Sequence, residues 1–467
     1  MKTAPLLKKI NNCVSSIEKQ PVNIFCLGCA IKVPLKKTLL PALKTLQHSA
    51  SLTGVNIDLG HDAYVFNASK PVGISRNVYP SCRKNGFAAS VASDIKRCGA
   101  NSAVLLTSFM PPAEQSNIEN AISGFYRNIP PDNKPFRIGK GHTIQISKVP
   151  SQEFILADYI ISSPGDLCCA VNHDTIVTVD FNLRHCHWLN VLISFNNALN
   201  DLHALGIYKD ISLFPVYDVS NKRDKNDIQE SFATYINGFK RYNLRLTDCG
   251  PLNLGLECIG TSVSGFTDRE PPRISGLIPE QVLIITRPIG DLSALVWYIL
   301  ETTRGRPAAR MRELKTRVLN HMARSNIGIA EIIASYLPPR GKPFIPEKHI
   351  TASKDISGEG LGALEDMALF SKVDIHLETL RLHASETAKI QVRNNTANTN
   401  GAIVIAAHRK LAPRIMRDIK KTGSTPWIAG WVGNPSRSPK IYLKRSLREY
   451  PFLRKRPYDI FNRFVFT

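Results

Sequence analysis

The stretch that decides the fold is Thr175-Ile176-Val177-Thr178-Val179-Asp180, followed after a short connection by segment 188–206, Trp-Leu-Asn-Val-Leu-Ile-Ser-Phe-Asn-Asn-Ala-Leu-Asn-Asp-Leu-His-Ala-Leu-Gly. The first part predicts a strand over Thr175–Val179 that ends in Asp180. The second part carries apolar residues at helical spacing, which predicts a helix from about Trp188 to Leu205 that Gly206 ends. The apolar face of this helix consists of Leu192, Phe195, Leu199, Leu202 and Leu205. A strand followed by a helix indicates a mixed α/β chain.

Strands and helices continue to alternate on both sides of this stretch. Upstream, a strand over Cys168–Val171 follows Gly165-Asp166, and Pro271-Pro272 marks a boundary further downstream. The remaining expected strands are 58–65, 103–106, 211–216, 258–266, 282–286, 401–406 and 427–432. The remaining expected helices are 35–47, 86–98, 115–127, 224–240, 291–303, 308–322, 326–336, 361–370 and 408–421. With 467 residues, the chain is too long for one core, so two to four domains are expected.

The composition is that of a water-soluble globular protein. Hydrophobic residues make up 43% of the chain, and the mean hydropathy is -0.12. There is no run of eighteen apolar residues, and the first residues lack a hydrophobic signal core, so we expect a cytoplasmic protein that does not enter a membrane. The ten cysteines, all within the first 258 residues, are typical of reduced thiols rather than of a disulfide framework.

The chain is strongly basic, and the charge is unevenly placed. Its formal net charge is +22, and segment 409–467 holds fifteen Lys or Arg residues against three acidic ones. A surface of this kind attracts nucleic acid, nucleotide phosphates or an acidic protein partner. A solubilising tail is an equally good interpretation, so an RNA or acidic partner for this region is one of two open alternatives.

Four carboxylates stand at the ends of expected elements: Asp166, Asp180, Asp201 and Asp355. Brought together, they would repel one another unless a hard cation held them, and Mg²⁺ bridging nucleotide phosphates is the usual solution. Glycines at 290, 358, 360 and 362 precede expected helices, where backbone N–H groups can approach phosphate oxygens. Taken singly, each aspartate is more often a cap or turn residue.

A short N-terminal segment, Cys26-Leu27-Gly28-Cys29-Ala30-Ile31-Lys32-Val33-Pro34, combines thiols with a lysine. A nearby cation lowers a thiol pKa and increases the fraction of reactive thiolate. Taken alone, the residues fit a structural cysteine pair or half of a zinc site better than a reactive thiol, although no second ligand pair stands at a convincing spacing.

Together these stretches resemble the aminoimidazole ribonucleotide synthetase (PurM-like) superfamily, and within it the selenophosphate synthetase family. The segment from Cys29 to Pro34 is similar to the family's catalytic Cys-Gly-Cys-Lys-hydrophobic-Pro segment. Further similar segments are 165–171 (family Gly-Asp-Asp-Ala-Ala-Val), 178–181 (Thr-Thr-Asp-Phe), 200–206 (Ser-Asp-Val-Tyr-Ala-Met-Gly) and 355–361 (Asp-Val-Thr-Gly-Phe-Gly-Leu). The resemblance runs from about Cys26 to Val432.

The resemblance implies a role for each matching residue. Cys29 takes the position of the catalytic thiol, and Lys32 takes that of the essential lysine, which also contacts ATP. The implied metal ligands for Mg²⁺ are Asp62, Asp94, Asp166, Asp180, Asp201 and Asp355, and the implied ATP contacts are Asp180, Asp201, Gly139, Gly141, His142, Thr143, Gly358 and Gly360. The chain departs from the family at Leu167, which replaces a second acid, and at Ala30-Ile31, which replaces Gly-Cys.

Region 51–150 also resembles the family's N-terminal domain. It offers His61-Asp62-Ala63, Asp94 five residues before Gly99, and Gly139-Lys140-Gly141-His142-Thr143, which is similar to a family motif that 248–251 lacks. We interpret it as a divergent first copy of that domain, forming a pseudo-dimer within one chain, with an unrelated insertion or a homodimer as alternatives. The expected organisation is a mobile segment 1–50, the divergent copy 51–154, an ATP-binding domain 155–270, a C-terminal domain 271–433 and a basic tail 434–467.

The implied fold is α/β of the α+β type, with an N-terminal β-rich, barrel-forming unit and a C-terminal α/β sandwich. The implied activity is the ATP- and Mg²⁺-dependent activation of selenide or of a small sulfur nucleophile. A nucleotide-binding relative that has lost catalysis and acts as an RNA- or protein-binding scaffold is the alternative. Another ATP-dependent synthetase of the superfamily is a third, against which the thiol–lysine segment argues.

Overall fold

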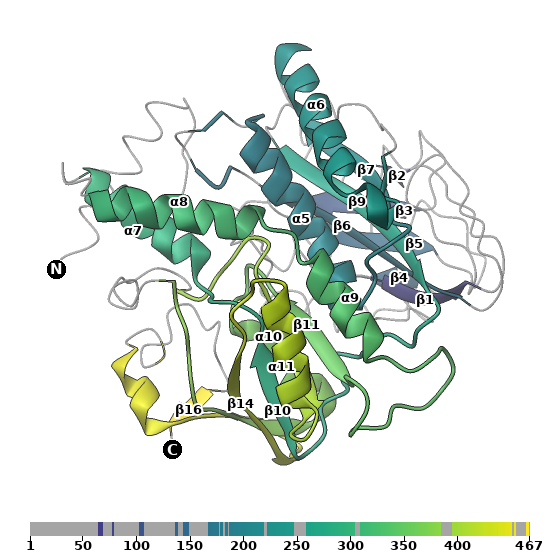
Figure 1. The fold of residues 1–467 in the computed structure, drawn as a ribbon, viewed down its shortest axis with the longest axis vertical. Coiled ribbons are helices and arrows are strands. Elements are labelled where there is room, and N and C mark those ends of the chain that lie inside the picture. Colours follow the sequence, from purple (N-terminus) through teal and green to yellow (C-terminus); the bar gives the residue numbers. More distant parts are fainter. Residues whose placement is uncertain are drawn as a thin grey trace, which may run out of the picture.

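The computed structural model describes residues 167–450, with gaps at 177, 181–182, 185, 219–221, 247–257, 304–308 and 384–394, together with residue 453 and separate strands on either side. These strands are β1 (Tyr64–Ala68), β2 (Asn77–Val78), β3 (Ser102–Leu106), β4 (Phe136–Ile138), β5 (Thr143–Lys148) and β16 (Phe464–Phe466). The described strands form three sheets (Figure 1). The described part is therefore a mixed α/β structure, as the alternating sequence pattern predicts.

The first sheet has the strand order β1-β6-β9-β7-β8. It contains β6 (Leu167–Ile176), β7 (Ser212–Asp218), β8 (Arg245–Leu246) and β9 (Cys258–Thr267), and the helices α5 (Trp188–Ala204) and α6 (Lys222–Gly238) follow its strands. Strand β6 pairs with β9 without interruption from Cys168 to Ile176. The separate strand expected at Thr175–Val179 is therefore wrong: one long strand ends at Ile176 because β9 begins opposite it, and Asp180 lies in the connection to α5.

The second sheet has the order β11-β13-β10-β14-β12-β15-β16. Its strands between 270 and 450 are β10 (Gln281–Ile285), β11 (Ala352–Ile356), β12 (Val373–Leu377), β13 (Ala402–His408), β14 (Trp427–Pro435) and β15 (Ile441–Leu443). The helices of this unit are α7 (Asp291–Thr303), α8 (Ala309–Ala323), α9 (Ile327–Ser335), α10 (Gly362–Ser371) and α11 (Ala412–Lys421). Strands β15 and β16 come from the segment expected to form a basic tail, so parts of that segment extend this sheet.

The third sheet has the order β2-β3-β5-β4 and comes entirely from residues before 150. Strand β1 leaves that region and pairs instead with β6, from Tyr64 opposite Val171 to Ala68 opposite Leu167. The regions 51–154 and 155–270 thus share a sheet. The barrel and the duplication of the N-terminal unit stay predictions.

Helix α5 lies between the two larger units (Figure 1). It begins after His187, whose Nδ1 accepts a hydrogen bond from Leu189 N, and it ends at Ala204, two residues before Gly206, whose φ is +77°. Its apolar side packs on the first sheet, in a core with residues such as Phe195, Leu199 and Leu202. Its other side carries asparagines and is also buried, because α8, α9 and β11 cover it. This buried polar side positions the candidate site.

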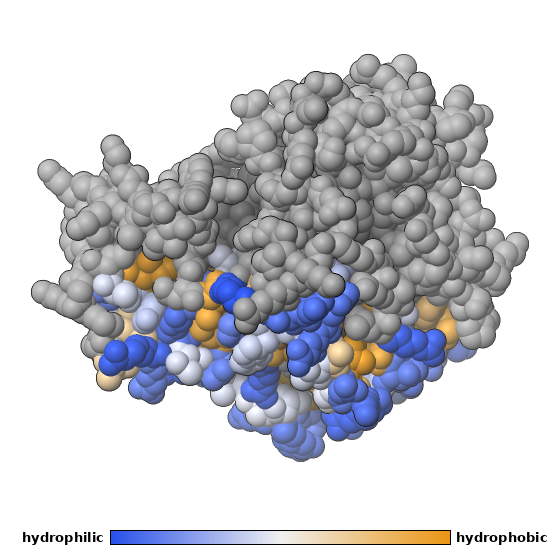
Figure 2. All heavy atoms as spheres, turned by 90° about the horizontal axis from the view of Figure 1, so that it is seen from above, coloured by the Kyte–Doolittle hydropathy of each residue, from blue (hydrophilic) through white to orange (hydrophobic). Residues whose placement is uncertain are grey.

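No described helix is both long enough and apolar enough to span a lipid bilayer. In the space-filling view, the described residues at the surface are mainly hydrophilic, and the hydrophobic ones form small separate groups (Figure 2).

Candidate functional site

Two polar residues of α5, Asn197 and Asp201, are hydrogen-bonded to the first sheet. Asn172 of β6 donates from Nδ2 to Asp201 Oδ2 at 2.7 Å and to the carbonyl of Ala198 at 3.0 Å. One turn earlier on the helix, Asn197 donates to the carboxylate of Asp174. Both aspartates are buried, so each carboxylate needs such partners to offset its desolvation. These bonds fix Asp201 relative to the sheet.

The same helix is bonded to the C-terminal unit at two points on either side of Asp201. Ser353 of β11 donates from Oγ to the carbonyl of Ala204, and Asn200 Nδ2 donates to the carbonyl of Gly401 at 3.4 Å. The neighbouring Ala402 pairs with Ile356, so Gly401 lies at the end of β11.

Asp355 lies on β11 two residues after Ser353, and alternate residues of a strand share a face. Because Ser353 is bonded to Ala204 and because α5 packs against β11, Asp355 lies on the strand that covers the C-terminal half of α5, where Asp201 lies. We call this place, defined by Asp201 and Asp355, the carboxylate junction. The sequence resemblance predicts both residues as ligands in one metal site; they lie on two elements that pack against each other, and their shared role stays a prediction.

The other buried carboxylate of the sequence prediction, Asp180, lies elsewhere. The backbone N–H of Val179 donates to Asn190 Oδ1 at 3.3 Å, which places Asp180 near the start of α5. Asn190 and Asp201 are eleven residues apart, or about 16 Å along a helix axis. Asp180 instead forms an ion pair with Lys315 of α8. One cation therefore does not bind both Asp180 and Asp201 in this arrangement.

A lysine also stands at the carboxylate junction. Lys354 is buried, and its Nζ lies 3.5 Å from Asp355 Oδ1 and 3.1 Å from Glu359 Oε1. Its ammonium group thus offsets part of the negative charge of Asp355.

The glycine loop before α10 is closed on itself. Gly360 N donates to the carbonyl of Ser357 at 2.9 Å, and Gly362 N donates to that of Glu359 at 3.0 Å. Gly360 has φ of +56°, and a Cβ there would lie 2.1 Å from Thr396 Oγ1, so only glycine fits. The amides of Gly360 and Gly362 both donate within the loop in this conformation, and their predicted contact with phosphate stays a prediction.

The same holds for the turn at Gly290. Its amide and that of Asp291 donate to Asn398 Oδ1 at 2.8 and 3.2 Å. Asn398 Oδ1 therefore already accepts from the two amides that a phosphate at this helix start would use.

Several predicted site residues fall outside the described residues. These are Cys29, Lys32, Asp62, Asp94, Gly139, Gly141, His142 and Asp166. Thr143 is the first residue of β5, and Gly358 lies in the loop before α10. The roles of these residues stay predictions.

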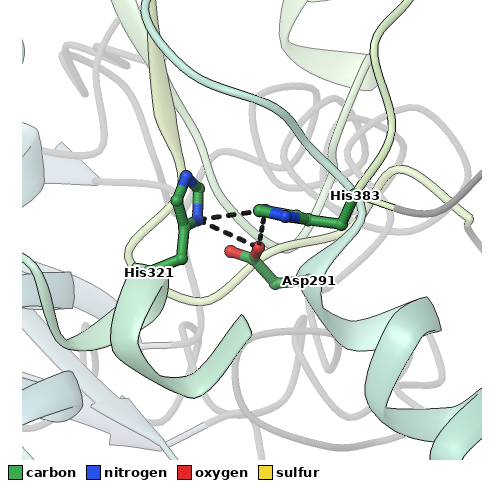
Figure 3. Close-up of side chains that lie close together, drawn as sticks. All are labelled: Asp291, His321 and His383. Atoms are coloured by element: carbon green, nitrogen blue, oxygen red, sulfur yellow. Dashed lines mark hydrogen bonds and ion pairs between the residues drawn. The ribbon is translucent and has the colours of Figure 1, made fainter. Parts of the chain in front are cut away.

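The structure also brings together three residues that sequence reasoning missed: Asp291, His321 and His383 (Figure 3). They come from the start of α7, from α8 and from the loop after β12. Asp291 Oδ1 lies 2.6 Å from His383 Nε2 and 3.1 Å from His321 Nδ1, and the two ring nitrogens lie 3.1 Å apart. Within the described residues, this is the group of His, Cys, Asp and Glu side chains whose geometry could hold a metal ion.

Burial and charge set the protonation of this group. Asp291 is fully buried, and burial tends to raise its pKa, but the charges and hydrogen bonds of His321 and His383 lower it well below its usual range. Burial lowers the pKa of His321 to about 4, and the positive charge of Arg287 adds to this effect against the opposing charge of Asp291. At neutral pH the group therefore holds a carboxylate and a neutral His321 imidazole.

Arg287, just after β10, forms hydrogen bonds with the backbone around the end of α8. Its guanidinium is buried and donates to the carbonyls of His321, Arg324, Asn400 and Gly401. Asn400 donates in turn to the carbonyls of Met322 and Arg324. Arg287 and Asn400 thus satisfy the unpaired carbonyls at the C-terminal end of α8, the helix that carries His321.

No protein-family model matches the chain, and no curated protein matches it. Among solved structures it is similar to thiamine-monophosphate kinase from Stenotrophomonas maltophilia, with 13% identity, a TM-score of 0.45, and coverage of 62% of this chain and 90% of that chain. It is also similar to a hydrogenase maturation protein HypE, with 15% identity, a TM-score of 0.44, and coverage of 61% of this chain and 85% of that chain. A thiamine monophosphate kinase from Aquifex aeolicus has 12% identity, a TM-score of 0.42, and coverage of 60% and 90%. The function proposed below rests on the residues of this chain.

Proposed function

We propose that this chain is an ATP- and Mg²⁺-dependent phosphotransferase whose metal and nucleotide phosphates bind at the carboxylate junction. The observation that supports the proposal is the pair of hydrogen bonds between α5 and the C-terminal unit, from Ser353 to Ala204 and from Asn200 to Gly401, next to two buried carboxylates, Asp201 on α5 and Asp355 on β11. Carboxylate oxygens are the ligands that Mg²⁺ prefers, and Mg²⁺ at such a junction neutralises charge on the transferred phosphoryl group.

The sequence resemblance supports the choice of acceptor. The segment with Cys29 and Lys32 is similar to the catalytic segment of selenophosphate synthetases, so we propose selenide or a small sulfur species as the nucleophile. In this proposal the segment that carries Cys29 delivers the nucleophile to the phosphoryl group, and Lys32 stabilises the transferred oxygens or keeps the Cys29 thiolate available. Asp62, Asp94 and Asp166 are further proposed Mg²⁺ ligands.

The test uses the full chain with ATP and Mg²⁺, with selenide, sulfide or an amine as acceptor, and follows AMP and ADP formation. Asp201→Asn and Asp355→Asn keep side-chain size and one acceptor oxygen but lose the charge that binds Mg²⁺, so turnover should fall by about 100-fold or more. Asp268→Asn, at an exposed position outside the junction, is the matched control and should keep wild-type turnover. Wild-type turnover in both junction variants would overturn the proposal.

A separate variant tests the acceptor chemistry. Cys29→Ala should abolish selenide- or sulfide-dependent turnover, while ATP binding measured by calorimetry should remain. Unchanged turnover in this variant would exclude the thiol from the reaction and leave the carboxylate junction to be judged by its own variants.

A second candidate function is favoured by the lysines at the carboxylates. Lys315 pairs with Asp180, and Lys354 lies between Asp355 and Glu359, so protein ammonium groups already offset charge that Mg²⁺ would otherwise balance. This arrangement favours a nucleotide-binding relative that has lost catalysis and serves as a scaffold for RNA or a protein. Failure to bind ATP with Mg²⁺, together with salt-sensitive RNA binding, would select this candidate.

A further inference from the structure

The three contacts among Asp291, His321 and His383 cannot all be hydrogen bonds when both rings are neutral. If both ring nitrogens donate to Asp291 Oδ1, two N–H groups face each other at the 3.1 Å contact between the rings. If one ring accepts from the other, its lone pair faces the carboxylate oxygen. Either arrangement leaves one repulsive contact, whereas a cation between the three atoms makes all three contacts favourable. Figure 3 shows the three side chains pointing toward one another.

Two polar atoms of this group are also buried without a hydrogen-bond partner among the described residues. These are the second carboxylate oxygen of Asp291 and Nε2 of His321. Asp291 is 0% exposed, so its carboxylate depends on partners inside the protein. An unpartnered carboxylate oxygen beside two imidazoles can provide a second contact to a metal.

The backbone holds the three residues in position. The carbonyl of Ile289 accepts a hydrogen bond from His383 N at 3.2 Å, and Ile289 N donates to the carbonyl of Arg381 at 3.1 Å. These two bonds fasten the loop that carries His383 to the turn that precedes Asp291. The turn itself needs a glycine, because Gly290 has φ of +88° and a Cβ there would lie 2.6 Å from the carbonyl oxygen of Asn395. Such support is what a metal site requires of the residues behind its ligands.

We propose that Asp291, His321 and His383 bind a divalent transition-metal ion, of which Zn²⁺ is the expected one. Two imidazoles and one carboxylate are a ligand set that suits zinc and neighbouring metals, whereas Mg²⁺ prefers an all-oxygen set. Three protein ligands leave a further position for water or a bound group. The site involves neither Asp201 nor Asp355, so it is distinct from the Mg²⁺ proposed at the carboxylate junction.

The first test measures metal content in the full chain purified without a histidine tag. After loading with Zn²⁺ and removal of free metal, the wild-type protein should retain about one equivalent more than His383→Ala or His321→Ala. His349→Ala, which removes a histidine of a surface loop, should retain the wild-type amount. Zinc affinity in the two ligand variants should fall by at least about 100-fold.

The second test does not depend on whether the ligand variants fold. Co²⁺ added to wild-type protein should give visible absorption bands of a histidine-ligated ion, which Zn²⁺ displaces. The protein with both Asp201→Asn and Asp355→Asn should give the same bands, which separates this site from the proposed catalytic one. Wild-type protein that retains no Zn²⁺ and gives no Co²⁺ bands would overturn the proposal, as would equal zinc retention in folded His383→Ala and His349→Ala.

Discussion

Replacing Arg287 by methionine should destabilise the protein strongly. The guanidinium is 2% exposed and donates to four main-chain carbonyls, of His321, Arg324, Asn400 and Gly401. Methionine fills a similar volume but donates nothing, so these acceptors lose a charged partner inside the protein. Each such bond to a charged group contributes about 1.5–3 kcal/mol. The net loss is smaller than the sum of four bonds, because the substitution also removes the cost of desolvating the guanidinium. We therefore expect a loss of about 3–5 kcal/mol in the free energy of unfolding.

Urea unfolding followed by circular dichroism measures this loss, and hydrogen exchange shows where it acts. The midpoint should fall by about 1–2 M, and amide protection should fall first at the C-terminal end of α8. Arg287→Lys keeps the charge without the planar fork and should lose an intermediate amount. Arg409→Met is the matched control, since Arg409 pairs with Glu280 at an exposed site, and it should change stability by less than about 0.5 kcal/mol. A loss below about 1 kcal/mol in Arg287→Met would refute this account of the buried guanidinium.

Two smaller perturbations test other parts of the C-terminal unit. Gly360→Ala adds steric overlap to a left-handed conformation and should lower the free energy of unfolding by about 3 kcal/mol or more. Gly341→Ala, at φ of +71° with open space around it, should lower it by about 1–2 kcal/mol. Equal losses for the two variants in urea unfolding would contradict the steric overlap at Gly360. Hydrogen bonds from Lys421 and Tyr336 lower the pKa of Asp418. Tyr336→Phe should raise that pKa, as NMR titration can measure, and cost about 0.5–1.5 kcal/mol. Because the folded-state pKa of Asp418 is lowered, this contribution is present at neutral pH and is lost as the pH falls through the carboxylate's titration range; a loss of stability that persists unchanged at low pH would contradict it.

Local sequence pattern predicts the helices well and the strands less well. Helix α7 has the expected bounds, and α5 begins at the expected residue, because apolar spacing and the glycine at position 206 are local signals. The bounds of β6 depend on its partner β9, which lies about ninety residues further along the chain, so a local pattern divided one strand into two.

Some residues of the candidate site could be predicted from sequence motifs, and others could not. Asp201 and Asp355 stood out because each matches a family motif, and their role as metal ligands stays a prediction. Asp291, His321 and His383 lie 30 and 62 residues apart on three elements, and no spacing rule connects them. The closure of the loop at Gly360 also depends on Thr396, a contact that a sequence cannot show.

The buried asparagines of α5 indicate that the carboxylate junction is a functional site rather than only a structural contact between two units. A helix that joins two units most stably buries apolar side chains on both sides, because a buried polar group must recover its desolvation cost through hydrogen bonds. Helix α5 instead buries Asn197, Asn200 and Asp201. Asn197 and Asp201 are both bonded to β6, and Asn200 accepts from Asn326, just before α9. Asn197 also accepts from the backbone N–H of Asn400 at 2.9 Å, which connects it to the C-terminal unit. Such a network orients one unit relative to the other but lowers the stability of the protein. Proteins tend to retain such networks where a functional site needs polar groups in fixed positions. A variant with Asn200→Leu should accordingly weaken nucleotide binding more than its effect on stability explains, since the leucine can pack but cannot bond Asn326 across the junction.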